Sequence, residues 1–330
     1  MYKRQLLLAR AKFAKVISTF LGSSADGGLI NKVESDGCIH PSFNQTVTAT
    51  GRLSSSNPNG QNLPRKGTSP IKKVFKSRYG KIVNVDLSQI EYRVAAALSR
   101  DSRMVAEIRS GLDAHADNAE KLFKADRSDP DAFDRVRTTA KVLTFRLLYG
   151  GTASGFFKDS SMPTYDLKTW EEIVDGYWKK YPELKAWQNR NIEEMNKTGR
   201  IVSASGRIYC FEQSRGYNGA WMYSPRQACN FPVQGGSKDL MDLALAVIRK
   251  RLRDAGVRSK IILLVHDSIV FDAYLEEVDT ICRIAIGVFE SLPELAKIYF
   301  NWDICVPLTG DCEVGDDYGS LSKYHDWQNN

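Results

Sequence analysis

The chain has 330 residues, of which 42% are hydrophobic and 26% charged, and its formal net charge is +7 at pH 7. These proportions are typical of a folded protein with one large or two modest domains, and they exclude a wholly disordered chain. No stretch approaches the roughly 20 uninterrupted apolar residues of a membrane helix, so we expect no membrane association.

The N-terminal segment and the cysteines bear on the compartment. Leu6–Leu21 is apolar but is interrupted by Arg10, Lys12 and Lys15, which disfavours a secretory signal peptide. The segment has no acidic residue, and a surface helix is favoured over a mitochondrial presequence. The six cysteines form no Cys-x-x-Cys pair, and the four histidines lack zinc-finger spacing. We therefore expect reduced thiols, no structural zinc and a cytoplasmic location.

Basic residues gather in two segments of the chain. Arg65–Lys81 contains seven basic residues and no acidic residue, and Arg249–Lys260 contains six basic residues and the single acid Asp254. Such segments predict a polyanionic partner, although solvated surface faces explain them equally well when they are considered alone.

The first predicted elements surround a polar loop. Thr50–Pro64 is rich in Gly, Ser, Asn and Pro, which is typical of an ordered irregular connection. The β-branched run Ile82–Val85 predicts a strand that ends at Asp86. Apolar residues at helical spacing follow from Gln89 onwards, so Asp86 lies at a strand exit just before a helix. Functional side chains often collect at such positions.

Helical patterns fill the middle of the chain. We expect helices over residues 104–158, of which Asp131–Tyr149 is the longest, and over Leu167–Lys197 with a break at Tyr181-Pro182. Lys238–Ala255 also has a helical pattern. Because strands occupy both ends of the sequence and helices its middle, the predicted fold class is α+β.

Two acids lie at the ends of apolar strands. Ile261–Val265 and Ser268–Phe271 predict a hairpin whose turn is His266-Asp267, and Asp86 ends the earlier strand. An ionised carboxylate in apolar surroundings is costly unless it binds a cation. Two carboxylates that converge from separate strands could hold a pair of Mg²⁺ ions, which would activate an attacking oxygen and stabilise a leaving pyrophosphate. Each acid taken alone could instead cap a turn.

A mixed stripe runs along the longest predicted helix of this region. Arg137, Lys141, Phe145 and Tyr149 follow one another in four-residue steps. Each step turns the helix by about 40° beyond a full turn, so the four side chains form one slanted row. Two cations followed by two aromatic rings suit a nucleotide, with its phosphates on the cations and its base and sugar on the rings. A solvated basic edge over a buried aromatic end is the alternative.

Five segments carry a resemblance to a known protein family. They are Thr48–Asn59 with Gln61–Pro64, Asp86–Arg93, Arg137-x3-Lys141-x3-Phe145-x3-Tyr149-Gly150, Asn230–Gly235 and Val265–Asp267. Together they resemble the family A DNA polymerases, of the DNA polymerase I type. The resemblance runs from about Leu6 to the C-terminus, and the order of the motifs makes it very specific.

The resemblance implies a right-hand polymerase fold, with a palm of antiparallel sheet and helices, helical fingers and a thumb remnant. The implied segments are a thumb remnant with its connection over 1–45, the first palm part over 46–103, the fingers over 104–222 and the second palm part over 223–330. Family members carry a thumb and often an exonuclease domain before the Thr50-Gly51-Arg52 motif, and only a short segment precedes it in this chain. We therefore expect an N-terminally truncated polymerase whose chain contains no exonuclease domain.

The resemblance also implies three sets of site residues. Asp86 and Asp267 resemble the catalytic and metal-binding carboxylates, with the Leu87 carbonyl as a further metal ligand. The residues that resemble nucleotide-binding positions are Gln89, Glu91, His115, Arg137, Lys141, Phe145 and Tyr149. Those that resemble DNA-binding positions are Arg52, Gln61, Asn62, Arg226, Asn230, Gln234 and His266.

Within the nucleotide set, the implied roles agree with the stripe. Arg137 and Lys141 resemble the triphosphate grips, and Phe145 and Tyr149 the platform for base and sugar. His115 resembles a further phosphate contact, and Glu91 the residue that blocks a ribose 2′-hydroxyl.

The sequence departs from the family pattern at several positions. Ser268 stands where the family usually has Glu after the second Asp, which removes a supporting carboxylate. Arg146 replaces a small Gly after the platform Phe, Thr144 replaces a common Asn, and Leu87 takes a position that is often Tyr. These changes put the metal affinity and the fit of the nucleotide near Phe145 in question.

The function that the sequence predicts is template-directed transfer of deoxynucleotides to a primer 3′ end, with two Mg²⁺ ions, primer–template DNA and dNTPs as partners. Upstream thumb or exonuclease domains would be further partners. A catalytically weak nucleic-acid-binding fragment is the first alternative, because the thumb is missing. A metal-dependent phosphodiesterase that uses the same Asp pair is the second. The source, whether phage, bacterium or organelle, stays open.

Overall fold

The computed structural model describes residues 10–11, 13–14, 16–22, 28–64, 69–216 and 219–325. The chain divides into two compact units. Unit 1 comprises Met1–Val85, Val257–Cys282 and Cys312–Asn330, and unit 2 comprises Asp86–Gly256 and Arg283–Asp311. The predicted fingers segment, 104–222, lies within unit 2, and the boundaries of the four predicted segments stay predictions.

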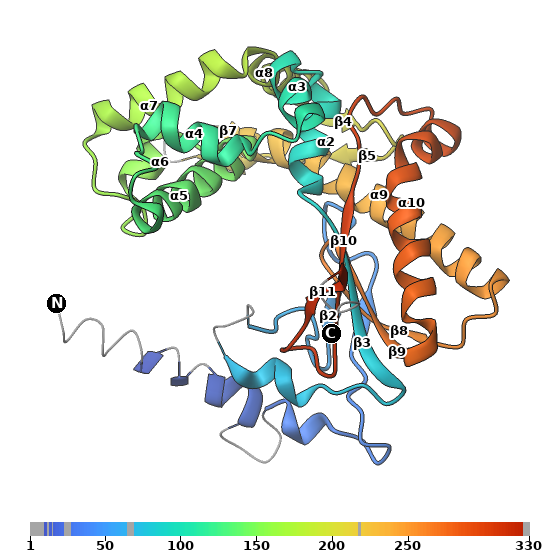
Figure 1. Ribbon diagram of the computed structural model, residues 1–330. Helices are drawn as coiled ribbons and strands as arrows, with labels where there is room; N and C mark the ends of the chain where they lie inside the picture. Colours follow the sequence, from blue (N-terminus) through green and yellow to red (C-terminus); the bar gives the residue numbers. More distant parts are fainter. Residues whose placement is uncertain are drawn as a thin grey trace. The chain divides into compact units, whose positions relative to one another are not determined.

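A five-stranded sheet with the order β11-β10-β3-β9-β8 forms the frame of unit 1 (Figure 1). Its strands are β3 (Gly80–Leu87), β8 (Lys260–Val265), β9 (Ser268–Tyr274), β10 (Gly310–Gly315) and β11 (Ser322–Lys323). The last two residues of β3, Asp86 and Leu87, already belong to unit 2. The predicted strand at Ile82–Val85 and the predicted hairpin around His266-Asp267 are both confirmed.

A buried apolar cluster packs against the sheet of unit 1. Ile82, Val270 and Leu321 form a buried cluster, with Leu263 and Tyr318 packed against it.

β8 and β9 pair antiparallel, with Val265 opposite Ser268, so the turn between them contains only two residues. His266 adopts the left-handed conformation in this turn, with φ of 52°, which His tolerates better than most non-glycine residues.

Short elements complete unit 1. They are a π-helical turn (Ile17–Leu21), three 3-10 turns (Ile30–Lys32, Pro70–Val74 and Leu275–Glu277) and the paired strands β1 (Ser42–Asn44) and β2 (Ser54–Ser56). The predicted loop Thr50–Pro64 therefore contains a three-residue strand. Of the predicted N-terminal surface helix, residues 6–9, 12 and 15 lie outside the described residues.

Unit 2 is built mainly of helices. They are α2 (Ile90–Ser99), α3 (Ser102–Ser110), α4 (Ala114–Phe123), α5 (Pro130–Leu148), α6 (Ala153–Phe157), α7 (Leu167–Lys180), α8 (Pro182–Thr198) and α9 (Pro225–Asp254). Two small hairpins precede α9, namely β4 (Arg200–Val202) with β5 (Ile208–Cys210), and β6 (Ser214–Arg215) with β7 (Trp221–Met222). α10 (Val278–Phe300) begins in unit 1 and continues into unit 2.

Side-chain caps determine where the helices of the predicted fingers begin. The Asp113 carboxylate accepts hydrogen bonds from the backbone N–H groups of His115 and Ala116, so α4 begins at Ala114. Asp129 caps α5 in the same way, and Pro130 occupies its first position. α4 packs against α5 and α7, as Figure 1 shows. These contacts bring the start of α4 beside the stripe on α5.

Helix α9 is longer than its sequence pattern predicted. It begins at Pro225 rather than near Lys238 and contains Pro232 in its interior. Gly236 allows a close approach to the neighbouring chain, because a Cβ there would lie 3.1 Å from the Trp302 ring and 3.2 Å from Val94 Cγ1. The segment Asn230–Gly235 lies within this helix.

The observed mixture of helices and antiparallel sheet confirms the predicted α+β class. In the described ranges, no helix is both long and apolar enough to cross a membrane.

Candidate functional site

The second predicted catalytic acid, Asp267, lies in the β8–β9 turn of unit 1. Its carboxylate is partly buried, and Arg52 Nη2 lies 3.8 Å from Asp267 Oδ1. Burial raises the pKa of Asp267, and the positive charges of Arg52 and His266 only partly oppose this effect. A carboxylate whose pKa is raised by burial is one that a bound cation would stabilise in its charged form.

Three further residues of unit 1 belong to the predicted DNA-binding set. The Gln61 side chain donates from Nε2 to the Leu264 carbonyl at 3.0 Å, which holds it beside the hairpin. Asn62 and His266 are exposed. The structure therefore brings Arg52, Gln61, His266 and Asp267 to one end of the β8–β9 hairpin.

The first predicted catalytic acid, Asp86, lies at the exit of β3 and is the first residue of unit 2. Its side chain is exposed, so the expectation of a desolvated acid is wrong at this position. The strand end carries the polar side chain into solvent, whereas Asp267 is sheltered in its turn. The two aspartates belong to different units, and their pairing stays a prediction.

The donor groups at these two positions fit a divalent cation of the Mg²⁺ type. Carboxylate and carbonyl oxygens are the ligands that Mg²⁺ prefers, and Mg²⁺ usually keeps several waters while binding only one or two protein carboxylates. Among the described residues, no group of three or more His, Cys, Asp or Glu side chains could hold a metal ion. The magnesium site at Asp86 and Asp267 therefore stays a prediction.

The predicted nucleotide stripe forms on α5 of unit 2. Arg137 and Phe145 are partly buried, Lys141 is exposed, and Tyr149 follows the last helical residue, Leu148. Arg137 Nε donates to Asp113 Oδ2 at 2.7 Å. The Tyr149 hydroxyl donates to the Glu91 carboxylate. The helix thus presents its four predicted residues in one row, with an acid from a neighbouring element beside each end.

Asp113 is a site residue that the sequence reasoning missed. Burial alone would raise its pKa, but hydrogen bonds from the Ala116 backbone and from Arg137 hold the pKa of this carboxyl below its usual value. The Asp113 carboxylate is thus paired with the Arg137 guanidinium, the group that is predicted to bind a triphosphate. An Asp two residues before His115, at a helix start, is a typical N-cap signal and could have drawn attention to it.

His115 lies deeper than a phosphate contact would suggest. The residue is 2% exposed, and both ring nitrogens are buried without a hydrogen-bond partner. Its ring lies 5.9 Å from the Phe145 ring and 6.0 Å from the Tyr92 ring, centroid to centroid. The pKa of His115 is lowered to about 4, chiefly by burial; Asp113 opposes this effect, and the charges of Lys141 and Arg137 reinforce it. The imidazole is therefore neutral at pH 7, and its phosphate contact stays a prediction.

Burial of His115 leads to a testable dependence of stability on pH. Because the folded pKa is near 4 and an unperturbed His titrates near 6.5, the folded state loses stability as the pH falls from about 6.5 to 4, by up to about 3 kcal/mol. We expect His115→Phe to remove this loss and to stabilise the fold at neutral pH, because two unpaired buried nitrogens are removed.

Urea unfolding at about pH 7.5 and about pH 5 measures both effects. His40→Gln is the matched control, because His40 is an exposed histidine whose Nε2 lies 3.2 Å from Asp36 Oδ2. A His115→Phe variant that loses as much stability as the parent between the two pH values would contradict the assignment.

Three predicted DNA-binding residues share one row on α9. Arg226, Asn230 and Gln234 are spaced four residues apart, so they lie on one side of the helix. Arg226 also adjoins the end of the stripe, because a Cβ on Gly150 would lie 3.3 Å from Arg226 Cα. Gly150 has a φ of 74°, and both features favour glycine at this position. The structure thus joins the α9 row to Tyr149-Gly150.

Three residues that depart from the family pattern, Arg146, Thr144 and Ser268, each interact with a defined group. Arg146 Nη1 pairs with Asp159 Oδ2 at 2.5 Å, and its guanidinium lies 5.8 Å from the centroid of the Phe156 ring. Thr144 is buried and donates to the Ala140 carbonyl at 2.9 Å. Ser268 is also buried and donates to the Val265 carbonyl at 2.9 Å. The Arg146 guanidinium therefore pairs with Asp159 rather than with the Phe145 ring.

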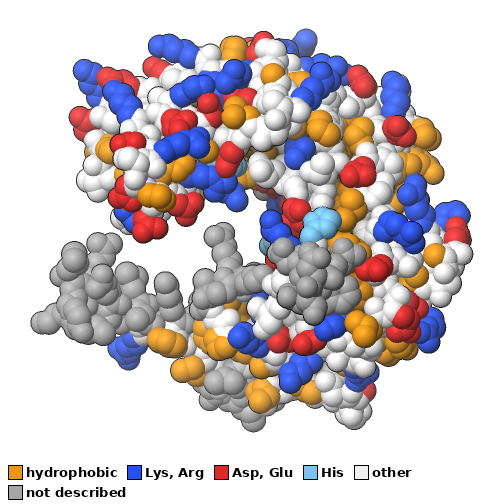
Figure 2. Space-filling model, viewed as in Figure 1, with side chains coloured by type: hydrophobic (Ala, Val, Ile, Leu, Met, Phe, Trp, Pro, Cys, Tyr) orange, Lys and Arg blue, Asp and Glu red, His pale blue; other side chains and the backbone are white. Residues whose placement is uncertain are grey.

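The two basic segments are partly neutralised by acidic neighbours. In the first segment, Lys81 Nζ lies 2.6 Å from Asp316 Oδ1, while Arg65 and Lys66 lie outside the described residues. In the second segment, Lys250 pairs with Asp254, and Arg258 pairs with Glu276 and Glu277. Figure 2 likewise shows acidic side chains interspersed with basic ones over the helices of unit 2. Binding of a polyanion by these segments stays a prediction.

Comparison with known proteins identifies the family. The family model for DNA polymerase family A matches residues 4–320. The chain belongs to DNA polymerase family A.

Related family A sequences come from bacteria and a phage. DNA polymerase I of Chloroflexus aurantiacus is 32% identical over 320 residues, which cover 96% of this chain and 32% of that protein. The thermostable DNA polymerase I of Thermus aquaticus is 33% identical, with 87% of this chain and 33% of that protein covered. The DNA polymerase of Bacillus phage SP01 is 30% identical, with 94% and 35% covered. The chain thus spans about a third of the length of these family A relatives.

A solved structure of a family A polymerase domain has the same fold. The polymerase domain of Pol1 from M. smegmatis, in complex with DNA primer–template and dNTP, superimposes with a TM-score of 0.76 at 27% identity. The match covers 89% of this chain and 50% of that chain.

Proposed function

We propose that this chain catalyses template-directed DNA synthesis, the transfer of a deoxynucleotide from a dNTP to a primer 3′ end. The stripe on α5 is the observation that carries the proposal. It places two cations, Arg137 and Lys141, before two aromatic rings, Phe145 and Tyr149, in one row. Membership of DNA polymerase family A supports the same function.

In the proposed reaction, the primer 3′-oxygen attacks the α-phosphorus of the dNTP, and pyrophosphate leaves. Asp86, Asp267 and the Leu87 carbonyl would hold Mg²⁺, which when bound supplies charge neutralisation for the attacking and leaving oxygens. Arg137 and Lys141 bind the triphosphate, and Arg137 exchanges its Asp113 partner for phosphate oxygens. Phe145 and Tyr149 orient the base and sugar. The chain contributes mainly positioning and electrostatic stabilisation.

Primer extension with labelled dNTPs in Mg²⁺ tests the proposal. Lengthening of the primer supports a polymerase. A gel shift of primer–template without extension would indicate a binding fragment, and shortening of the primer would indicate a phosphodiesterase. Omission of Mg²⁺ in the presence of a chelator is the control.

Glu91 offers a test of sugar selection. We expect Glu91→Ala to raise the incorporation of ribonucleotides about tenfold or more, because its side chain, held by the Tyr149 hydroxyl, fills the space that a 2′-hydroxyl would need. The measurement is the ratio of kcat/KM for dNTP and rNTP. Tyr149→Phe is the matched control, because it removes the hydrogen bond but keeps the bulk of Glu91. An unchanged ratio in Glu91→Ala would place the sugar gate elsewhere.

A further inference from the structure

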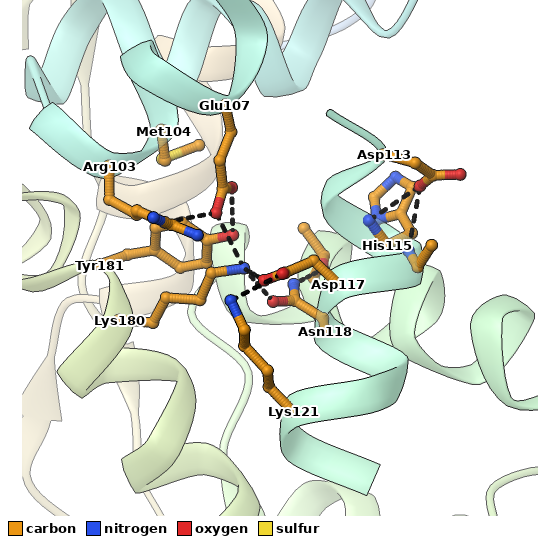
Figure 3. A network of polar contacts seen from close by, with 12 residues as sticks. Arg103, Met104, Glu107, Asp113, His115, Asp117, Asn118, Lys121, Lys180 and Tyr181 are labelled. Carbon is orange, nitrogen blue, oxygen red and sulfur yellow. Dashed lines mark hydrogen bonds and ion pairs between the residues drawn. The ribbon is translucent and has the colours of Figure 1, made fainter. Parts of the chain in front are cut away.

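A largely buried cation, Lys180, lies at the end of α7 in unit 2. The Lys180 side chain is only 10% exposed. Its Nζ donates to Asp117 Oδ2 at 2.7 Å and to Asn118 Oδ1 at 2.6 Å, and lies 3.1 Å from Glu107 Oε1 (Figure 3). The ammonium group thus donates two hydrogen bonds and forms an ion pair with a second carboxylate.

The acceptors of Lys180 are themselves held in place. Glu107 is buried, and its Oε1 also accepts from Arg103 Nε at 2.7 Å. Its Oε2 accepts from the Tyr181 hydroxyl at 2.8 Å. Three cations, Arg103, Lys121 and Lys180, therefore surround the two carboxylates of Glu107 and Asp117 in this cluster. Each member has a defined partner, which is the condition under which a buried polar network makes the surrounding structure rigid.

The cluster is connected to the nucleotide stripe through α4. Asp117 and Asn118 lie one helical turn after Asp113 and His115, on the same short helix. Asn118 Nδ2 also lies 3.4 Å from Thr144 Oγ1, its hydrogen-bond acceptor on α5, directly before Phe145. A shift or rotation of α4 would therefore move both the partner of Arg137 and the ring that packs on Phe145.

On the basis of the proposed function, we propose that Lys180 is a positioning residue for nucleotide binding. It fixes α4 so that Asp113 and His115 stay opposite Arg137 and Phe145. Stability alone does not explain a buried ion cluster, because apolar residues of similar volume are often at least as stabilising. What a fully paired cluster adds is a single arrangement of the helices that it joins.

Lys180→Gln in the full chain tests the proposal, with Lys121→Gln as the matched control. Lys121 pairs with the same Asp117 carboxylate at 2.7 Å but is 55% exposed. We expect Lys180→Gln to raise the KM for dNTP about fivefold or more while kcat stays within about twofold, because it disturbs binding and not the reacting atoms. We expect Lys121→Gln to change both constants less than about twofold. An unchanged KM in Lys180→Gln would overturn the proposal.

A double-variant cycle checks that Lys180 acts through Asp117. Asp117→Asn alone should also raise the KM, and Lys180→Gln should raise it by a smaller factor in the Asp117→Asn background than in the parent, because the Lys180–Asp117 pair is already weakened there. If the two substitutions raised the KM by independent factors that multiply in the double variant, Lys180 would not act through Asp117. If Lys180→Gln shows no cooperative thermal transition, Asp117→Asn, which keeps the shape of the side chain, provides the same comparison.

Hydrogen exchange separates failure of this proposal from failure of the proposed function. We expect amides of α4 to exchange about tenfold faster or more in Lys180→Gln, while those of α10 and those of Lys121→Gln stay unchanged. This readout requires no activity. A parent that incorporates no dNTP would refute the polymerase function, whereas unchanged α4 exchange in Lys180→Gln would refute the positioning role.

Discussion

Asp86→Asn and Asp267→Asn are each expected to reduce primer extension by about 10³-fold or more, a barrier increase of about 4 kcal/mol. Each substitution removes one negative charge from the proposed Mg²⁺ ligands and preserves the shape of the side chain. Neither acid supplies a positive charge to the DNA, so primer–template affinity should stay within about threefold. Binding by fluorescence anisotropy and extension under saturating dNTP measure the two quantities separately.

The effect should differ in detail between the two acids. Asp267 is partly buried with a raised pKa, whereas Asp86 is exposed. Protonation therefore competes with cation binding at Asp267, and we expect the Mg²⁺ concentration for half-maximal extension to rise as the pH falls. Asp316→Asn is the matched control, because Asp316 is an exposed acid of unit 1 that pairs with Lys81. Extension within about tenfold of the parent in either active-site variant would remove that Asp from the catalytic role.

Phe145→Tyr is expected to reduce discrimination against dideoxynucleotides by about five- to 150-fold. The phenyl ring offers no hydroxyl, so the 3′-hydroxyl of an incoming dNTP must satisfy a nearby buried polar group. A dideoxynucleotide leaves that group unpaired, at a cost of about 1–3 kcal/mol, and a Tyr hydroxyl would restore the missing partner. Incorporation of ordinary dNTPs should change little.

The surroundings of Phe145 support this expectation. The ring is partly buried and lies 5.9 Å from His115, while the neighbouring Arg146 is paired with Asp159. The measurement is the ratio of termination to extension at matched ddNTP and dNTP concentrations. Phe133→Tyr is the control, because it makes the same change near the other end of α5. Equal ratios in the parent and Phe145→Tyr would mean that Phe145 does not line the sugar.

Local patterns in the sequence were sufficient for the elements that carry the candidate site. The β-branched run before Asp86 and the two apolar runs around His266-Asp267 form strands as predicted. The four residues spaced in four-residue steps from Arg137 to Tyr149 lie in one row along α5. These features depend on the backbone period alone, which any intact helix or strand enforces. The sequence pattern placed the start of α9 too late, because proline is unusual inside a helix and Pro232 lies in the interior of this one.

The tertiary structure decided which of these side chains are buried and which are paired. Arg137 meets Asp113 across 24 positions of sequence, and Lys180 meets Asp117 across 63. His115 is neutral because α4 and α5 pack around it, and Asp86 is exposed although the sequence suggested a desolvated acid. The sequence by itself determined the residue types, their order and their periodicity. Desolvation and ion pairing depend on how helix faces pack together, and only the folded chain sets those contacts.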